Sequence, residues 1–240
     1  MPAMDEQSAA VAAVVAAIRG GDLAALQQLI DEQPALVSAR VNGRTALHVV
    51  TDWPGYYPNG PEVVRMLVAA GADPDVRTEG KGAPETPLHW AASSDDLDVA
   101  DALIDAGADL EAPGGSIGTP LDNAIGYGCW HVARRLVERG ARIDKLWHAA
   151  ALGLMPLVQD LLAATPAPSP QEITEAFWQA CHGGQRRTAE YLLQHGADIN
   201  GIPAYAKQTA LDIAVAPDTR RDLLGTWLRE QGAGLANKTT

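Results

Sequence analysis

The sequence predicts an all-α fold in which short helix-turn-helix units are stacked side by side. Two short phrases recur along the 240 residues, at intervals that suit one such unit. Gly occurs 23 times and aromatic residues make up only 5% of the chain, while Ala and Leu are abundant. This composition suits closely packed short helices joined by tight turns, whereas a β-sandwich needs more Val, Ile, Thr and aromatic residues.

The first phrase marks where helices begin. It reads Thr45-Ala46-Leu47-His48, Thr86-Pro87-Leu88-His89, Thr119-Pro120-Leu121-Asp122 and Thr209-Ala210-Leu211-Asp212. A Thr hydroxyl caps the first turn of a helix, and Pro at the first helical position loses only a donor that the helix leaves unpaired. The phrase therefore predicts a helix after each Thr.

The second phrase marks where helices end. It reads Gly71-Ala72-Asp73, Gly107-Ala108-Asp109 and Gly196-Ala197-Asp198, with variants at 140–142 and 232–234. Gly accepts the left-handed conformation that terminates a helix. Each unit therefore ends in a tight turn, the finger, before the next unit begins.

Together these phrases resemble the signature of the ankyrin repeat family, T-P-L-H-x-A at a period near 33 residues. Leu88 and Leu121 are 33 residues apart, and the segments Leu146–Ala150 and Phe177–Ala180 keep the pattern without the Thr. The resemblance covers roughly residues 8 to 234 and is closest to ankyrin repeat proteins of bacterial type.

The resemblance implies an ankyrin-repeat α-solenoid with a concave groove, forming one domain over residues 1–240. We expect an N-terminal capping repeat at about 8–40 and repeats at 41–77, 78–112, 113–144, 145–169, 170–200 and 201–234, followed by a tail at 235–240. Each repeat contacts mainly its neighbours, because a single repeat cannot bury its own apolar face. The resemblance also implies that His48 and His89 are structural and tie neighbouring repeats together by hydrogen bonds.

Residues 51–62 interrupt the first full repeat with a long insertion. The segment holds three Pro, two Gly and the aromatic residues Trp53, Tyr56 and Tyr57, so it predicts a loop with an unusual aromatic content. Two interpretations stay open at this point. The rings either fold back over the edge of the array or form a lip that contacts a ligand.

Two other connections depart from the repeat. The Gly-rich finger at 113–118 permits unusual backbone angles or the close approach of a partner, but it also simply makes a turn. The segment 165–170 contains three Pro in place of the usual finger, and it predicts an extended connector.

The leading functional hypothesis is a module that binds a protein partner with its first helices, fingers and aromatic loop. Trp and Tyr combine a large apolar area with a polar group, as binding hot spots do. Aligning the repeats places Trp90 and His148 at one equivalent position of the first helix. The candidate binding residues are Trp53, Tyr56, Tyr57, Trp90, Ser94, Tyr127, His148 and His182. For Trp147, Trp178 and Trp227 we favour a packing role.

The alternative hypothesis is a small-molecule-binding protein or an enzyme, whose groove is roofed by the 51–62 loop. His48, Asp52, His89 and Asp122 are then the candidate acid and base groups. No nucleophile elbow, Gly-rich phosphate loop or HExxH zinc spacing accompanies them. A closed pocket that brings an imidazole and a carboxylate within hydrogen-bond reach would favour this alternative.

Charge and composition narrow the choice of partner. The formal net charge is −12 at pH 7, so nucleic acid and anionic membranes are poor partners. Cys129 and Cys181 show no metal-binding or disulfide spacing, which favours a reducing compartment. The acidic start is unlike a secretory signal. We therefore expect a cytoplasmic monomer that needs neither a cofactor nor a metal ion.

Overall fold

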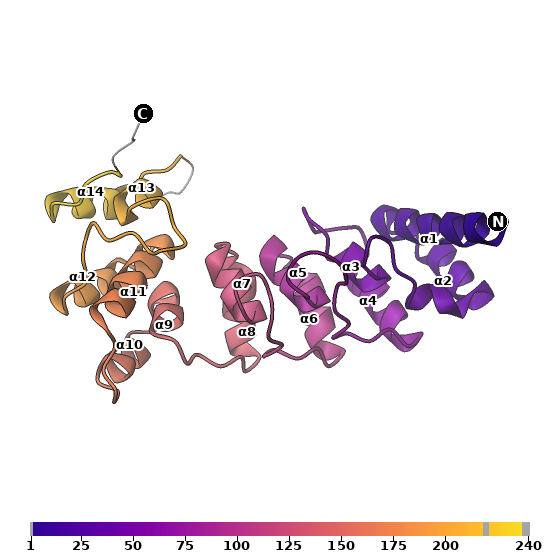
Figure 1. The fold of residues 1–240 in the computed structure, drawn as a ribbon, viewed down its shortest axis with the longest axis horizontal. Coiled ribbons are helices and arrows are strands. Elements are labelled where there is room, and N and C mark those ends of the chain that lie inside the picture. The colour runs from indigo at the N-terminus through magenta and orange to yellow at the C-terminus, as the bar shows by residue number, and fades with distance from the viewer. Residues whose placement is uncertain (1, 218–220, 237–240) are drawn as a thin grey trace. The chain divides into compact units, whose positions relative to one another are not determined.

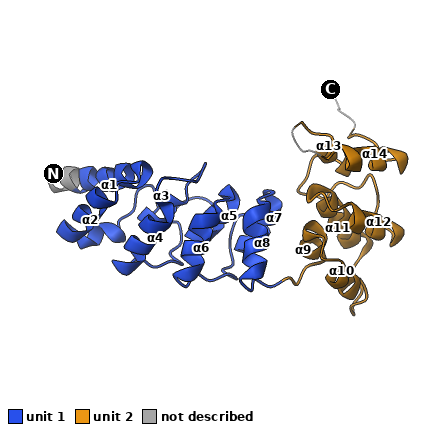
Figure 2. Ribbon diagram, turned by 180° about the vertical axis from the view of Figure 1, so that it is seen from behind, with its two compact units in different colours: residues 1–142 blue, residues 143–240 orange. Residues whose placement is uncertain are grey.

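The computed structural model describes residues 2–217 and 221–236, and its regular structure within them is helical (Figure 1). An isolated β-bridge joins Val41 to Arg44. The predicted all-α class is therefore correct. Contacts divide the chain into two compact units, Met1–Arg142 and Ile143–Thr240, here called unit 1 and unit 2 (Figure 2). No helix among the described residues is long and apolar enough to cross a membrane.

Unit 1 consists of four successive helix pairs. Its helices are α1 (Pro2–Gly20), α2 (Leu23–Glu32), the short 3-10 helix η1 (Pro34–Val37), α3 (Ala46–Val50), α4 (Gly60–Ala69), α5 (Pro87–Ser94), α6 (Leu97–Asp105), α7 (Pro120–Gly126) and α8 (Trp130–Glu138). The first helices of the repeats pack on one another, α3 on α5 and α5 on α7, and the second helices α4, α6 and α8 form a parallel row. Figure 1 shows this stacking.

Unit 2 repeats the arrangement with three pairs. They are α9 (Leu146–Leu152) with α10 (Met155–Leu162), α11 (Pro170–His182) with α12 (Arg186–Gln194), and α13 (Ala210–Ala214) with α14 (Asp222–Glu230). The first helix α11 packs between α9 and α13. Each segment expected to be a repeat holds one helix pair, while α1 begins at Pro2 rather than near residue 8. Of the expected tail, residues 237–240 lie outside the described part of the chain.

Capping boxes start the first helices α3, α5, α7 and α13, as the recurring Thr predicted. In the first full repeat the Thr45 N–H donates to Nδ1 of His48 at 3.3 Å. In the third, the Thr119 N–H donates to Oδ2 of Asp122 at 2.8 Å, so the carboxylate takes the position of the imidazole. Ser169 and Glu172 form the same box at the start of α11. The box at α11 follows from Ser-x-x-Glu before an apolar run, a sequence signal of a helix start.

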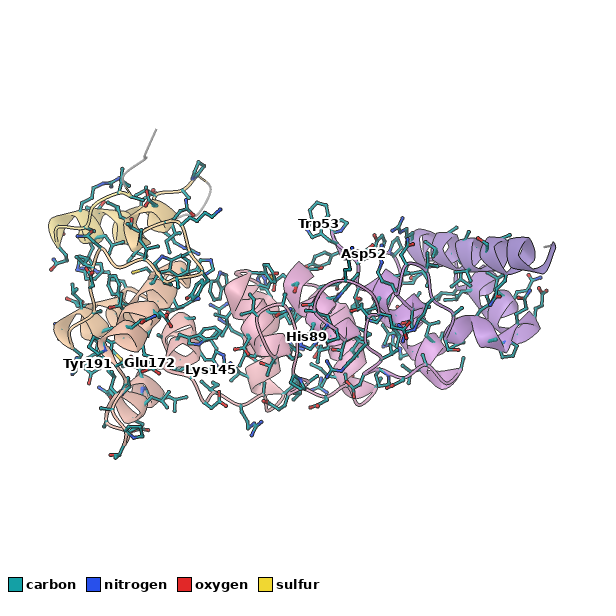
Figure 3. All side chains as sticks on the ribbon, viewed as in Figure 1. Asp52, Trp53, His89, Lys145, Glu172 and Tyr191 are labelled. Atoms are coloured by element: carbon teal, nitrogen blue, oxygen red, sulfur yellow. The ribbon has the colours of Figure 1, made fainter. Side chains whose placement is uncertain are left out.

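The two histidines of the phrase connect successive repeats of unit 1. Nδ1 of each ring accepts from the Thr N–H of its own capping box, so Nε2 carries the proton and donates to the next repeat. His48 reaches the Glu85 carbonyl at 3.1 Å, and His89 reaches the Gly118 carbonyl at 3.0 Å (His89 is labelled in Figure 3). Both rings are fully buried. The structural role implied by the resemblance is therefore observed.

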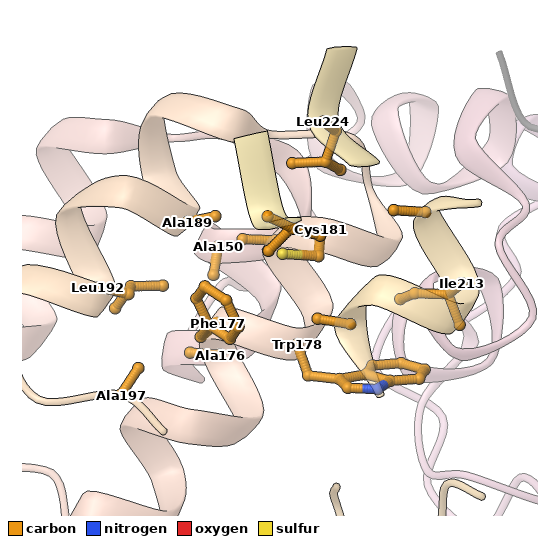
Figure 4. Packing of buried hydrophobic residues seen from close by; sticks show 14 of the residues in the cluster. Ala150, Ala176, Phe177, Trp178, Cys181, Ala189, Leu192, Ala197, Ile213 and Leu224 are labelled. Atoms are coloured by element: carbon orange, nitrogen blue, oxygen red, sulfur yellow. The ribbon is translucent and has the colours of Figure 1, made fainter. Parts of the chain in front are cut away.

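Apolar side chains from successive repeats merge into the core of each unit. In unit 1 the Leu of the phrase is buried at 47, 88 and 121. In unit 2 Phe177 is completely buried and Trp178 is 8% exposed (Figure 4). Trp227 of the same unit is 4% exposed. Small residues such as Ala150 and Ala189 let neighbouring helices approach closely. Trp178 and Trp227 are thus packing residues, as the sequence analysis favoured.

Candidate functional site

The 51–62 loop is fixed to unit 1 on both sides. The Tyr56 N–H donates to the Asp96 carboxylate at 2.5 Å, and the Tyr56 hydroxyl donates to the Asp95 carbonyl, both at the turn between α5 and α6. On the other side Nδ2 of Asn59 donates to the Gly21 carbonyl at 2.8 Å. Tyr56 and Asn59 both have positive φ angles, of 57°. These contacts hold the loop in one position against the neighbouring repeats.

Fixing the loop leaves Trp53 at its tip, where 78% of the residue is exposed. Figure 3 shows the Trp53 side chain projecting beyond the ribbon. Tyr56 is 63% exposed in spite of its two hydrogen bonds, while Tyr57 is half-buried. The rings at 53 and 56 therefore do not fold back into the array. These two rings therefore differ from the first interpretation of the insertion, and their contact with a ligand stays a prediction.

A pocket of about 190 Å³ lies beside Trp53. Its lining residues come from the loop, from α5 and Glu85 before it, from the Gly-rich finger and from the residue that follows α7. They are Thr51, Asp52, Trp53, Glu85, Trp90, Ser93, Ser94, Ser116 and Tyr127. Tyr127 is 55% exposed, and its hydroxyl lies 3.1 Å from the Ser116 hydroxyl. The pocket thus combines three aromatic side chains with four hydroxyl-bearing neighbours.

Trp90 forms the wall between this pocket and a second one. The second pocket has a volume of about 320 Å³ and lies between residues 42–44 and the 78–85 segment. The edge of the Trp90 ring meets His48 with centroids 5.4 Å apart, and the Arg44 guanidinium lies 5.5 Å from the Trp90 ring centroid. The indole N–H is buried and has no hydrogen-bond partner within the described residues. The ring contact with His48 and the cation contact with Arg44 therefore orient the Trp90 side chain without a hydrogen bond to its indole N–H.

The two carboxylates of the first pocket are in different environments. Asp52 pairs with Arg19 at 3.4 Å and with Arg44 at 3.3 Å. Glu85 accepts from the Ser116 N–H and from Nδ2 of Asn123, both at 2.8 Å. Desolvation alone would raise the pKa of Glu85, but these hydrogen bonds outweigh it and lower the pKa. Glu85 therefore carries a negative charge in a neutral solution.

The four acid and base candidates are not assembled into one site. His48 and His89 are buried in their capping boxes, Asp122 caps α7, and Asp52 is paired with two arginines. None of the residues that line the pocket beside Trp53 is a histidine. Among the described residues, this pocket therefore lacks the imidazole and carboxylate pair that would favour the enzyme alternative.

The last two binding candidates, His148 and His182, belong to unit 2. His148 is 2% exposed, and its ring lies 4.2 Å from that of Trp147. His182 lies 5.3 Å from the Trp178 ring, and burial, reinforced by the charge of Arg221, lowers the pKa of His182 to about 4. The burial of His148 argues against direct contact with a partner. The six remaining candidates all lie in unit 1.

Several residues of the pocket were not among the candidates. Glu85, Ser93, Ser116 and Thr51 line it, and Asn123 orients Glu85. Ser116 lies in the Gly-rich finger, and this finger was the one available signal. A Cβ at Gly115 would overlap the His89 ring, so the glycine lets the finger pass close to α5 and brings Ser116 to the pocket.

Comparison with known proteins supports the repeat assignment. Residues 55–145 match the family described as ankyrin repeats, three copies. An ankyrin repeat and KH domain-containing protein of Caenorhabditis briggsae is 29% identical over 146 residues, which is 58% of this chain and 6% of that protein. Protein fem-1 homolog A of Bos taurus is 40% identical over 79 residues, which is 30% of this chain and 12% of that protein. The human neurogenic locus notch homolog protein 4 is 34% identical over 113 residues, which is 43% of this chain and 6% of that protein.

Residues 55–145 are thus similar to ankyrin repeats, and among the described residues further helix pairs lie on both sides of this segment. The chain spans no more than 12% of the length of these three relatives. All three are animal proteins, so the expected bacterial type is not confirmed.

Proposed function

We propose that unit 1 binds a protein partner through the surface around Trp53. This Trp53 surface consists of Trp53, Tyr56, Trp90, Ser94 and Tyr127. The observation that carries the proposal is the exposure of Trp53, 78%, at the tip of a loop that is tied to two neighbouring repeats. When a partner covers an aromatic ring that a fixed backbone holds in water, the burial of its large apolar area contributes strongly to the binding free energy.

The fixed loop favours tight binding because little order has to be gained when the complex forms. Immobilising a side chain at an interface costs roughly 0.5–1.5 kcal/mol, and a loop that is already ordered avoids part of this cost. The serine hydroxyls and the Tyr127 hydroxyl supply hydrogen-bonding groups beside the aromatic area. A hydrophobic centre with polar neighbours is typical of protein interfaces.

The dimensions of the pocket favour a protein over a free small molecule. Its volume of about 190 Å³ is below the range of roughly 300–1,000 Å³ that is usual for small-molecule sites. A single side chain of a partner fits such a volume, while Trp53 and Tyr127 contact the surface around it. Protein binding also agrees with the presence of ankyrin repeats at 55–145.

The wider setting is part of the same proposal. The net charge of −12 disfavours nucleic acid and anionic membranes. Cys129 and Cys181 are both buried and unbridged, which suits the reducing cytoplasm. We place the protein there as a monomer, with one repeat domain over residues 1–240 and no cofactor or metal requirement.

The experiment that tests the proposal is a comparison of two exposed apolar residues. A partner is captured with the wild-type chain, identified by mass spectrometry, purified and titrated by calorimetry against Trp53→Ala and Leu223→Ala. Leu223 is 81% exposed and belongs to unit 2, so it serves as the control. We expect Trp53→Ala to weaken binding by at least about tenfold and Leu223→Ala to leave it unchanged. Equal affinities of the wild type and Trp53→Ala would refute the site.

A further inference from the structure

A third pocket, with a volume of about 440 Å³, lies entirely within unit 2. It is formed by the start of α9, the end of α10, the Pro-rich connector and the start of α11. The apolar part of its lining comes from Leu146, Trp147, Leu161, Pro166 and Pro168. Charged side chains also line the pocket. We call this the Trp147 pocket.

One face of Trp147 already holds a positive charge. The Lys145 ammonium lies 5.4 Å from the centroid of the Trp147 ring, within the distance at which cations are attracted to the face of an indole. The ring meets His148 edge-on at 4.2 Å, and this contact fixes its orientation. Trp147 is half-buried, so part of the ring faces the pocket. The ring is therefore positioned to bind a cation.

Three carboxylates, of Asp144, Glu172 and Glu175, line the same pocket (Lys145 and Glu172 are labelled in Figure 3). Glu172 and Glu175 are three residues apart on α11, so they project from the same side of the helix. Oε2 of Glu172 accepts from the N–H and the hydroxyl of Ser169, both at 2.8 Å, and these bonds lower the pKa of Glu172. Against these three negative charges the pocket has one ammonium, that of Lys145.

Glu172 and Glu175 each retain an oxygen for a further bond. Oε1 of Glu175 accepts from Nε2 of Gln171 at 3.2 Å, and only Oε2 of Glu172 is used by Ser169. Within the described residues no donor reaches the second oxygen of either group. A ligand with several N–H donors and a positive charge complements this arrangement.

From this combination we infer that the Trp147 pocket binds an arginine side chain of a peptide segment. The guanidinium group stacks on an indole face, donates to two carboxylates at once and is more weakly hydrated than an ammonium group. Its three-carbon stem packs against apolar walls such as those of Leu161 and Pro168. The ammonium of Lys145 occupies a position that the guanidinium takes over, so Lys145 competes with the ligand.

The binding test uses short peptides that differ in one side chain. Uniformly labelled full-length protein is titrated with acetylated Gly/Ser peptides that carry one arginine, lysine or citrulline, and the indole N–H signal of Trp147 is followed by NMR. Citrulline has the shape of arginine without the charge. We expect a saturable shift with the arginine peptide, a weaker one with lysine and none with citrulline. An equal response to citrulline, or no response to arginine, would overturn the inference.

Matched variants separate the pocket from the general negative charge of the chain. The double variant Glu172→Gln/Glu175→Gln is expected to weaken binding of the arginine peptide roughly tenfold. The control Glu190→Gln/Glu230→Gln removes the same charge from exposed positions outside the pocket and is expected to have little effect on binding. Gln also serves in a capping box, so α11 keeps its start. Equal losses in the two double variants would show non-specific attraction and contradict the inference.

Two lysine variants and one variant of the Trp53 surface complete the test. Lys145→Met is expected to strengthen binding of the arginine peptide, whereas Lys207→Met, at an exposed position outside the pocket, makes the same charge change without this effect. Weaker binding by Lys145→Met would refute the competition. Trp53→Ala is expected to leave peptide binding unchanged, since the Trp147 pocket does not depend on the proposed function of unit 1.

Discussion

Acidification from about pH 7 to about pH 5 is expected to destabilise the chain through His48. Burial lowers the pKa of this imidazole from 6.5 to about 4, and the charges of Arg40 and Arg44 add to the effect, although the hydrogen bond to the Glu85 carbonyl opposes it. In the folded state Nδ1 must accept from the Thr45 N–H. A proton on Nδ1 removes this acceptor and breaks the capping box.

The magnitude follows from the difference between the folded and unfolded pKa values. Because the folded value lies below the unfolded one, the stabilisation is fully present above pH 6.5 and is lost as the pH falls toward about 4. At about pH 5 the unfolded ring is protonated and the folded ring is mostly neutral, which corresponds to a loss of about 2 kcal/mol. Burial likewise lowers the pKa of His89, which adds to the loss in the same direction.

The assay is urea unfolding at the two pH values, followed by circular dichroism and tryptophan fluorescence. His48→Gln removes one titrating group and keeps a side chain that can accept from Thr45. When the pH is lowered from about 7 to about 5, the free energy of unfolding of the wild type is expected to fall further than that of His48→Gln. The two decreases should differ by about 2 kcal/mol. The exposed His195→Gln serves as the control and should show the wild-type pH dependence. An identical pH dependence in His48→Gln and the wild type would refute the reasoning.

Three further changes probe other parts of the account. Phe177→Ala, at a completely buried position of unit 2, is expected to lower the free energy of unfolding by about 3–5 kcal/mol in urea titrations. Gly118→Ala places a methyl group on Oδ2 of Asp122 and should cost up to about 2 kcal/mol by disturbing the cap of α7, whereas Gly20→Ala, with open space around it, should not destabilise. Asp101→Asn removes ion pairs to Arg135 of α8 and to Arg139 directly after it, and its destabilisation should shrink in about 1 M NaCl; a salt-independent effect would contradict the ion-pair explanation.

The sequence predicted the repeats well because their signals are local. A Thr three residues before His48 or Asp122 identifies a capping box, and a Gly after an apolar helix identifies its end. The spacing between phrases then places each helix pair. The exposed Trp53 was also a sequence-based candidate, because an aromatic residue in a Pro- and Gly-rich insertion is unusual.

The contacts that form the sites were not predictable in the same way. Tyr56 is fixed by Asp95 and Asp96, about 40 residues away in sequence, and no short motif indicates such a contact. Repeat alignment placed His148 at the position equivalent to that of Trp90, but the alignment does not show that His148 is 2% exposed. The Trp147 pocket depends on the path of the Pro-rich connector. Its carboxylates lie at positions that the repeat pattern predicts only to be on the surface.

The most direct test of the central claim is the affinity of Trp53→Ala for the purified partner, measured beside the wild type. The account predicts an affinity lower by at least about tenfold with an unchanged free energy of unfolding, since Trp53 is 78% exposed and contributes little to the core. An unchanged affinity would contradict the claim that this fixed aromatic loop is the binding surface of unit 1.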